Sequence, residues 1–387
     1  MNDTTNTSLT QRVLEEQEAI NAIALTRLSY FSLAMLHELY RQLGSATAIV
    51  EHRNNLLELL PNASNHIVEA FRNMDDAIGR AEAEYQWDID NKIQVLAMSD
   101  PRYPQRMLDC PDAPLVVYYR GNADLNKSKV LSIIGTRHST NYGHDIIRKF
   151  VSDLRQYCPD VLIVSGLAYG VDIHAHREAL KNGYPTVGVL AHGLDQIYPN
   201  AHRNTAIEML SNGGLLTEYI SQTPAAKGNF VQRNRIVAGM CDACILVESA
   251  EKGGGLITMG IANDYHRDCF AFPGAINAEY SKGCNKLIRD NRASLITSAE
   301  DLVKAMGWMS DMELDKAKQE GIERQMFPEL SAEEQKVVNA LAEDNDQQIN
   351  MLAVRTAIPI NKLSTLLFYL EMKGVVKTLA GGSYHLL

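Results

Sequence analysis

Hydrophobic residues in the middle of the chain form short continuous runs, each followed by a turn and a helix-like segment. The runs cover residues 130–134, 161–164, 186–190, 215–218, 243–248, 269–272 and 294–297. Continuous apolar runs are typical of strands buried on both faces, and intervening helices imply right-handed crossovers into a parallel sheet. The pattern predicts an α/β fold with a Rossmann-like, mostly parallel sheet core, whose ligands bind outside the carboxyl ends of the strands.

Both flanks of this core are patterned as helices. Apolar positions recur at helical spacing over residues 20–84, and a β-rich run covers 115–120. Near the other end, Ser331 and Glu334 have the spacing of a capping box, and helices at 352–357 and 360–373 precede a hairpin that turns at Gly381-Gly382. We therefore predict a helical N-terminal domain of SAM or helix-hairpin type (1–93), a Rossmann-like DNA-binding domain (94–308), a linker (309–329) and a winged-helix-like domain (330–387).

Composition and charge narrow the function classes. The chain has 387 residues, of which 45% are hydrophobic and 22% charged, as expected for a globular protein of several domains. No apolar run approaches the roughly 18 residues of a membrane span, the first residues lack the features of a secretory signal, and six scattered cysteines suggest no disulfide framework. These features predict a cytoplasmic protein with no membrane contact.

The net charge of -10 is spread unevenly along the chain. It amounts to -8 over residues 1–100, +2 over 101–300 and -4 over 301–387. This balance argues against coating of nucleic acid by charge alone, but a near-neutral middle with arginines at loop ends can bind phosphates locally.

Small and polar residues recur where the predicted strands end. Each loop taken alone is explained equally well by a tight turn or by close helix packing, but repetition at one edge of a sheet predicts a groove that binds phosphate. No Gly-x-Gly-x-x-Gly follows the first strand and no Walker A sequence occurs, which argues against a dinucleotide enzyme and a P-loop ATPase. The candidate ligands are Gly135, Thr136 and Arg137 after the first strand, Ser165 and Gly166 after the second, Gly254 and Thr258 after the fifth, and Lys282 and Asn285 at a later helix start.

The segment 227–236 combines cations, amides and an aromatic ring before the strand at 243–248. On a helix Phe230 and Asn234 share a face, whereas Arg233 and Arg235 diverge, so that one arginine faces the ligand and the other the protein. Stacking of a base on Phe230 with a phosphate contact from Lys227 is typical of single-strand binding. The alternative is a core phenylalanine beside a solvated basic face.

The sequence contains no clear set of metal ligands or catalytic residues. Cys241 and Cys244 lack a second pair, and His174 and His176 face different ways on a helix, so we predict neither a metal nor another cofactor. No pair of carboxylates stands out as a catalytic acid and base, and Glu218, Glu248 and Asp172 are candidates for these roles by location only.

Together these motifs resemble the DNA-processing protein DprA (Smf) family. The resemblance spans roughly residues 95–300 and rests on the blocks 135–137, 165–172, 193–199, 230–236, 272–274 and 281–285. It implies a bacterial protein without catalytic activity that binds incoming single-stranded DNA during natural transformation, protects it, loads the recombinase RecA and dimerises through the Rossmann-like domain. It also implies that Gly135, Thr136 and Arg137 hold backbone phosphate, with Lys227, Phe230, Arg233, Asn234 and Arg235 lining the same groove.

Three motifs depart from the family pattern. Thr136 replaces the usual serine, and Asn200 replaces a lysine that often follows Tyr-Pro, which makes Arg203 a candidate substitute for the lost phosphate contact. Val231 and Gln232 stand where the family usually has proline and a basic residue, so one cation of the groove is absent.

Two other function classes remain open from the sequence. The glycine-rich loop 253–258 is faintly similar to the phosphate loop of nucleoside monophosphate phosphoribohydrolases, although no glutamate follows it at the expected place. The helix at 360–373 could enter a major groove in a winged-helix regulator of duplex DNA, but Lys362, Lys373 and Lys377 are its few cations.

Overall fold

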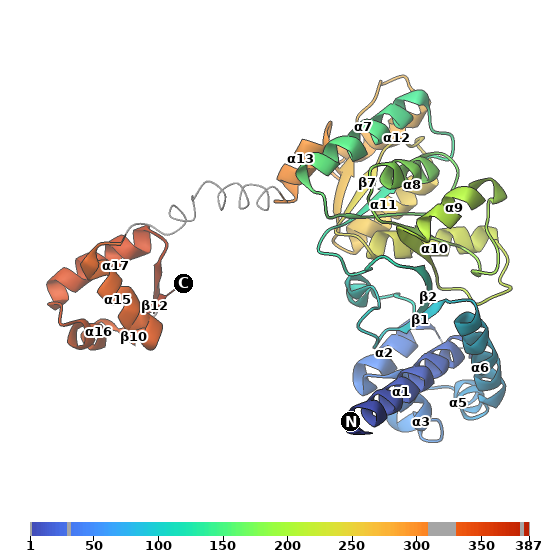
Figure 1. The fold of residues 1–387 in the computed structure, drawn as a ribbon, viewed down its shortest axis with the longest axis horizontal. Helices are drawn as coiled ribbons and strands as arrows, with labels where there is room; N and C mark the ends of the chain where they lie inside the picture. Colours follow the sequence, from blue (N-terminus) through green and yellow to red (C-terminus); the bar gives the residue numbers. More distant parts are fainter. Residues whose placement is uncertain (1, 29–31, 309–329, 380–382, 387) are drawn as a thin grey trace. The chain divides into compact units, whose positions relative to one another are not determined.

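A nine-stranded sheet organises the first of two units in the computed structural model (Figure 1). The structure describes residues 2–28, 32–308, 330–379 and 383–386, with side chains from residue 12 onward. The two units comprise residues 1–309 and 310–387. The linker predicted at 309–329 and the turn predicted at Gly381-Gly382 lie outside the described residues.

The order of the strands across the sheet is β1-β2-β6-β5-β4-β3-β7-β8-β9. Strands β3 to β9 run parallel to their neighbours among themselves, whereas β1 and β2 are antiparallel, which confirms the predicted mostly parallel core. The chain moves outward from β3 to β6 and then returns to place β7 on the other side of β3. This reversal is the kind of switch point at which such sheets bind ligands. The strands are β1 (Gln94–Ala97), β2 (Val116–Gly121), β3 (Val130–Ile134), β4 (Leu162–Ser165), β5 (Thr186–Val189), β6 (Gly213–Thr217), β7 (Ala243–Leu246), β8 (Asp268–Ala271) and β9 (Ser294–Leu295).

Helices cover both faces of the sheet, which explains the continuous apolar runs. In β3, Leu131 and Ile133 belong to one hydrophobic cluster, and Val130 and Ile134 belong to the other. The helices α7 (Asn141–Tyr157), α8 (Val171–Lys181) and α13 (Ala299–Ala305) pack on one face, while α10 (Lys227–Gly239), α11 (Gly254–Asp264) and α12 (Lys282–Arg289) pack on the other. The short helix α9 (Arg203–Met209) packs beside β5 and β6, and the 3-10 turns are η1 (Gln105–Asp109), η2 (Asn200–His202) and η3 (Glu279–Ser281).

The predicted N-terminal helices pack against β1 and β2. Val95 and Tyr118 of these strands belong to the hydrophobic cluster of the helices. The buried carboxylate of Glu84 accepts hydrogen bonds from the amide (2.5 Å) and hydroxyl (2.7 Å) of Ser221, which ties a helix to the loop after β6. Because this packing is extensive, helices and sheet form one unit, and the boundary at residues 93 and 94 stays a prediction. The helices are α1 (Asn2–Thr26), α2 (Leu33–Leu43), α3 (Ala46–Glu51), α4 (Leu56–Leu59), α5 (Asn65–Arg72) and α6 (Asp75–Asp90).

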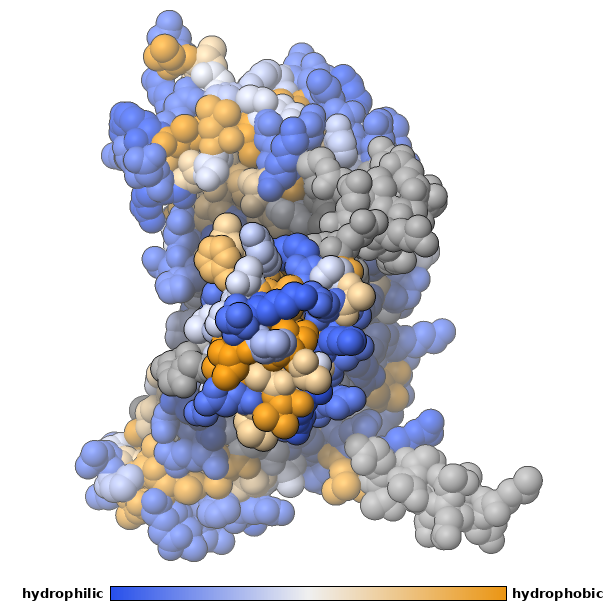
Figure 2. Space-filling model, turned by 90° about the vertical axis from the view of Figure 1, so that its left-hand side faces the viewer, coloured by the Kyte–Doolittle hydropathy of each residue, from blue (hydrophilic) through white to orange (hydrophobic). Residues whose placement is uncertain are grey.

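The second unit is a small helical module with its own core. Its described elements are α15 (Ala332–Glu343), α16 (Ile349–Thr356), α17 (Ile360–Met372), β10 (Gln347–Gln348), β11 (Val376–Leu379) and β12 (Ser383–Leu386). Ser331 and Glu334 form the predicted capping box at the start of α15. Figure 2 shows hydrophobic side chains on the face of this module that is turned toward the viewer. The exposed apolar residues of α16 and α17 are Met351, Val354, Ile360, Phe368, Tyr369 and Met372.

Asp88 of α6 makes the stability of the first unit depend on pH. Burial, and then the nearby carboxylate of Glu84, raise the pKa of Asp88 to about 8. In the unfolded chain an aspartate has a pKa of about 4. Between about pH 4 and pH 8, Asp88 therefore holds a proton in the folded protein that it has lost in the unfolded chain. The free energy of unfolding therefore falls as the pH rises through this window, by up to about 1.4 kcal/mol per pH unit.

We expect Asp88→Asn, which keeps the neutral shape, to remove this slope and to stabilise the protein more at pH 8 than at pH 5. Urea unfolding at the two pH values measures the difference. Asp90→Asn, at an exposed position of the same helix, serves as the control and should leave the slope unchanged. A wild-type slope that Asp88→Asn does not alter would show that another group is responsible.

Candidate functional site

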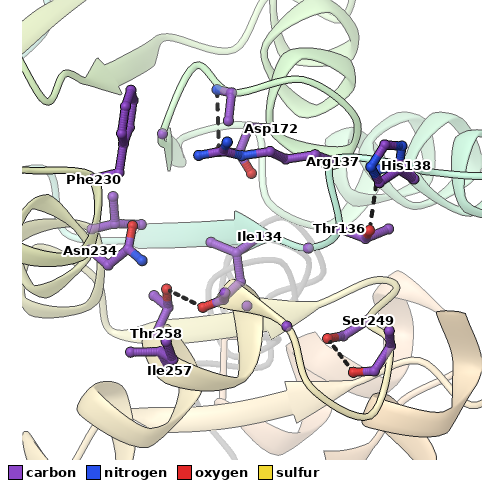
Figure 3. A pocket seen from close by; sticks show the side chains of 18 of the residues that line it. Ile134, Thr136, Arg137, His138, Asp172, Phe230, Asn234, Ser249, Ile257 and Thr258 are labelled. Atoms are coloured by element: carbon purple, nitrogen blue, oxygen red, sulfur yellow. Dashed lines mark hydrogen bonds between the residues drawn. The ribbon is translucent and has the colours of Figure 1, made fainter. Parts of the chain in front are cut away.

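A cavity of about 460 Å³ opens where β3, β4 and β7 end. Gly135 to His138 follow β3, and Gly166 and Ala168 follow β4. The segment after β7 contributes Ser249, Ala250 and 252–255, while α10 supplies Phe230 and Asn234 (Figure 3). We call this cavity the β3–β7 pocket. It lies outside the carboxyl ends of the strands, where the ligand was predicted to bind, and at the switch point of the sheet.

The first turn of α11 supplies backbone donors to the β3–β7 pocket. Gly253 precedes this helix without any side chain that caps it, and Gly254 and Gly255 line the cavity. The first amides of a helix have no partner within the helix and carry partial positive charge, so they favour an anion. Lys252 lines the same cavity directly before these glycines and adds a full positive charge.

Arg137 is the arginine available to a ligand. Its side chain extends from the end of β3 across the pocket, and its guanidinium carbon lies 5.2 Å from the centre of the Phe230 ring (Figure 3). It forms no ion pair with any residue that the structure describes. A guanidinium without a carboxylate partner can bind a phosphate through two parallel hydrogen bonds.

Arg233 occupies the floor of the β3–β7 pocket and is engaged by the protein. Only 3% of it is exposed, and its Nη1 donates hydrogen bonds to the carbonyl oxygens of Gly166 and Val189. Burial lowers the pKa of Arg233 to about 10, so the group stays protonated near pH 7. Burial also raises the pKa of Asp172, and the positive charge of Arg233 opposes this rise.

Two glycines make room for this arrangement. A Cβ on Gly166 would lie 2.6 Å from both Arg233 Nη2 and Asp172 Oδ2. Gly170 has a φ of +77°, and a Cβ there would collide with the carbonyl oxygen of Thr136. The glycines of the predicted second loop therefore allow it to pack against both the buried arginine and the first loop.

The structure separates the predicted site residues into two groups. Nine line the β3–β7 pocket: Gly135, Thr136, Arg137, Gly166, Phe230, Arg233, Asn234, Gly254 and Thr258. Six lie outside its lining: Ser165, Arg203, Lys227, Arg235, Lys282 and Asn285.

The contacts of several outlying residues explain their positions. Ser165 is fully buried and donates to the carbonyl oxygen of Ile133 (2.6 Å), so it joins neighbouring strands. Arg235 forms a 2.5 Å ion pair with Glu218, and the Asn285 amide is bonded to the backbone of Gly274. Arg203 lines a separate cavity of about 450 Å³.

Asn200 and Arg120 also line the cavity that contains Arg203, so Asn200, which departs from the family pattern, and Arg203, its candidate substitute, lie together.

Arg233 and Arg235 diverge as predicted, but both are buried and bonded to the protein. Neither takes the place of Arg137 as a free cation.

Sequence reasoning missed several residues that complete the site. Lys252 and Tyr280 line the β3–β7 pocket, and Tyr198 lies with its ring centre 5.7 Å from that of Phe230. The position of Lys252 before three glycines was a usable signal, and Tyr198 lies within a recognised motif. Tyr280 comes from the loop after β8, and no local pattern places it here.

Other candidate functions find less support in the side-chain contacts. Lys362 in α17 and Lys373 directly after it form ion pairs with Glu333 and Glu334, and the exposed residues of α17 include Ile360, Phe368, Tyr369 and Met372. This surface does not favour insertion into a duplex groove. Within the described ranges no three His, Cys, Asp or Glu residues are grouped as metal ligands. No helix in the same ranges is long and apolar enough to cross a membrane.

The two pocket arginines should differ in their effect on stability. Arg233→Ala leaves the Asp172 carboxylate and two carbonyl oxygens buried without their cation, so we expect the free energy of unfolding to fall by about 3 kcal/mol. Arg137→Ala breaks no ion pair, and we expect a change of about 0.5 kcal/mol or less. Urea unfolding of both variants tests this assignment, and equal losses would contradict it.

Comparisons with known proteins identify related chains. Residues 94–307 match the family described as DNA recombination-mediator protein A, and residues 325–382 match the DprA winged helix domain, which confirms the predicted C-terminal fold. The chain is 35% identical to the DNA processing protein DprA of Streptococcus pneumoniae over 236 residues, which cover 61% of this chain and 80% of that protein.

Solved structures show the same likeness. The X-ray structure of the S. pneumoniae protein is similar with a TM-score of 0.64 at 29% identity, over 75% of this chain and 97% of the other. The Helicobacter pylori DNA processing protein A, whose structure was described for its single-stranded DNA binding mode, is similar with a TM-score of 0.50 at 28% identity, over 56% of this chain and 95% of the other.

Proposed function

Because this chain belongs to the DNA recombination-mediator protein A family, we propose that it binds single-stranded DNA in the β3–β7 pocket. The family match confirms the resemblance that the sequence motifs indicated. The relatives also support the proposed function, because they are DNA-processing proteins and one of their structures concerns binding of single-stranded DNA.

The observation that carries the proposal is the combination of three groups around one cavity. The uncapped start of α11 and the guanidinium of Arg137 provide donors for a backbone phosphate, and Phe230 offers an aromatic face beside them. Stacking on a ring requires an unpaired base, so this combination suits a single strand better than a duplex. Tyr198 extends the aromatic surface next to Phe230.

We further propose that the protein acts without catalysis, in the bacterial cytoplasm, during natural transformation and recombination. There it would protect incoming single-stranded DNA and load RecA onto it, as the family resemblance implies. Two candidate catalytic carboxylates make their contacts away from the β3–β7 pocket: Glu218 is paired with Arg235, Glu248 accepts hydrogen bonds at the start of α7, and neither lines this pocket. These contacts support binding over nucleotide hydrolysis.

Binding measurements test the pocket directly. In fluorescence anisotropy, wild type should prefer a single-stranded oligonucleotide over a duplex of equal length. Arg137→Ala should weaken binding about tenfold through loss of a charge-assisted bond and reduce the slope of log K against log salt by about 0.7. Phe230→Ala should cost about 1–3 kcal/mol of stacking and leave the salt slope unchanged.

Arg155→Ala is the matched control, because Arg155 also lies over an aromatic ring, 5.1 Å from the centre of Tyr184. It should bind like wild type. Equal, weak binding of oligonucleotides by wild type and Arg137→Ala would overturn the proposal.

The free edge of the sheet supports a homodimer through the Rossmann-like domain. Strand β9 ends the sheet, both of its residues are exposed, and Leu295 is 50% exposed. An unpaired strand edge is a template for pairing with another chain. A second copy of the protein is the partner that we propose for this edge.

Light scattering tests the dimer. We expect a dimeric mass for wild type and a monomeric mass for Leu295→Lys, because the substitution places a charge in the proposed interface. Leu57→Lys, at an exposed leucine of α4, should remain dimeric. A monomeric wild type, or a dimer that survives Leu295→Lys, would exclude this edge.

A further inference from the structure

A second cavity of about 540 Å³ adjoins the β3–β7 pocket but has different chemistry. Its lining includes Thr140, Tyr142, Glu248, Pro273 and Ala278. Glu279 and Tyr280 line both cavities, so the two are neighbours in the fold. We call it the Glu248 pocket.

The Glu248 pocket is unsuited to a phosphate. No Lys or Arg is among its lining residues, and Glu248, which is 2% exposed, forms no ion pair in the described part of the chain. A buried carboxylate repels an anion, whereas its oxygens accept hydrogen bonds from a neutral donor. The ligand group expected here therefore has no negative charge and carries hydrogen-bond donors.

The walls favour a flat, largely apolar ring. The Tyr142 hydroxyl donates to the carbonyl oxygen of Pro273 (2.5 Å), which orients the Tyr142 ring. Tyr280 is stacked with His138 of the β3–β7 pocket at 6.3 Å between ring centres. Aromatic walls with one well-placed polar group are typical of pockets for small ring systems. A nucleobase next to a phosphate bound in the β3–β7 pocket meets these requirements.

The carboxylate selects among the bases. Glu248 accepts from the amide (2.8 Å) and hydroxyl (2.6 Å) of Thr140, one bond on each oxygen, and a carboxylate has about four acceptor sites. Guanine presents two adjacent donors on its pairing edge, N1–H and the exocyclic amine. Adenine and cytosine present one donor beside an acceptor, and thymine presents one donor between two acceptors.

We propose that the Glu248 pocket binds a nucleobase of the DNA strand held in the β3–β7 pocket, with preference for guanine through hydrogen bonds to the Glu248 carboxylate. This inference rests on the proposed binding of single-stranded DNA and adds a base preference to it.

The test compares oligothymidylates that carry one deoxyguanosine or one deoxyinosine, placed at each position in turn. Inosine lacks only the exocyclic amine. At the position that reaches the pocket, wild type should bind the guanosine strand about tenfold more tightly than the inosine strand, the difference expected for one bond to a charged acceptor. Glu248→Gln should reduce this ratio to near one while affinity for plain oligothymidylate stays within twofold.

Two further variants keep the result interpretable. Ala278→Trp fills the cavity from an exposed loop position without altering Glu248, and should also remove the guanosine preference. Glu208→Gln changes an exposed carboxylate of α9 that lines neither cavity and should retain it. Equal affinity of wild type for guanosine and inosine strands at every position would overturn this inference and leave the proposed function standing. Failure to bind any single strand would instead refute the proposed function.

Discussion

The site depends on one buried cation. Arg233 leaves α10 and reaches the carbonyl oxygens of Gly166 after β4 and Val189 at the end of β5, beside Asp172 in the first turn of α8. A charge buried this deeply is tolerated only when carbonyl and carboxylate oxygens surround it, so the segments that supply them are held in fixed positions. The loops that line the β3–β7 pocket are thus positioned before any ligand arrives, and Arg137 remains free for the ligand.

The core strands could be predicted from the sequence because their burial leaves a pattern within each short segment. Strands such as β3 are apolar on both faces, since helices cover the sheet on both sides, and continuous runs therefore revealed the places of these strands. The strand order, and with it the switch point, came only from the structure. The edges were harder to predict. Only Ser294–Leu295 of the run 294–297 forms a strand, and β1 is too short to leave a clear pattern.

The sequence could not predict which arginines bond to the protein and which one faces the ligand. Arg233 and Arg235 are two positions apart in one basic segment, and their partners come from distant parts of the chain: a carbonyl oxygen at the end of β5 for Arg233 and the Glu218 carboxylate after β6 for Arg235. The same holds for Tyr280, whose place beside His138 results from the path of the loop after β8. In contrast, the strand-end glycines and Phe230 were found because their local sequence already has the required chemistry.

The account places backbone phosphate and a base stacked on Phe230 in the β3–β7 pocket and a further base in the adjoining Glu248 pocket, and it assigns no DNA contact to the apolar residues of α17. Photo-crosslinking of the full-length protein to a single-stranded oligonucleotide that carries 5-bromodeoxyuridine, followed by mass spectrometry, tests this most directly. We expect the crosslinked peptides to contain Phe230, Tyr198 or Tyr280, and to disappear in Arg137→Ala. Crosslinks confined to α16 or α17, unaffected by Arg137→Ala, would contradict the assignment of the site.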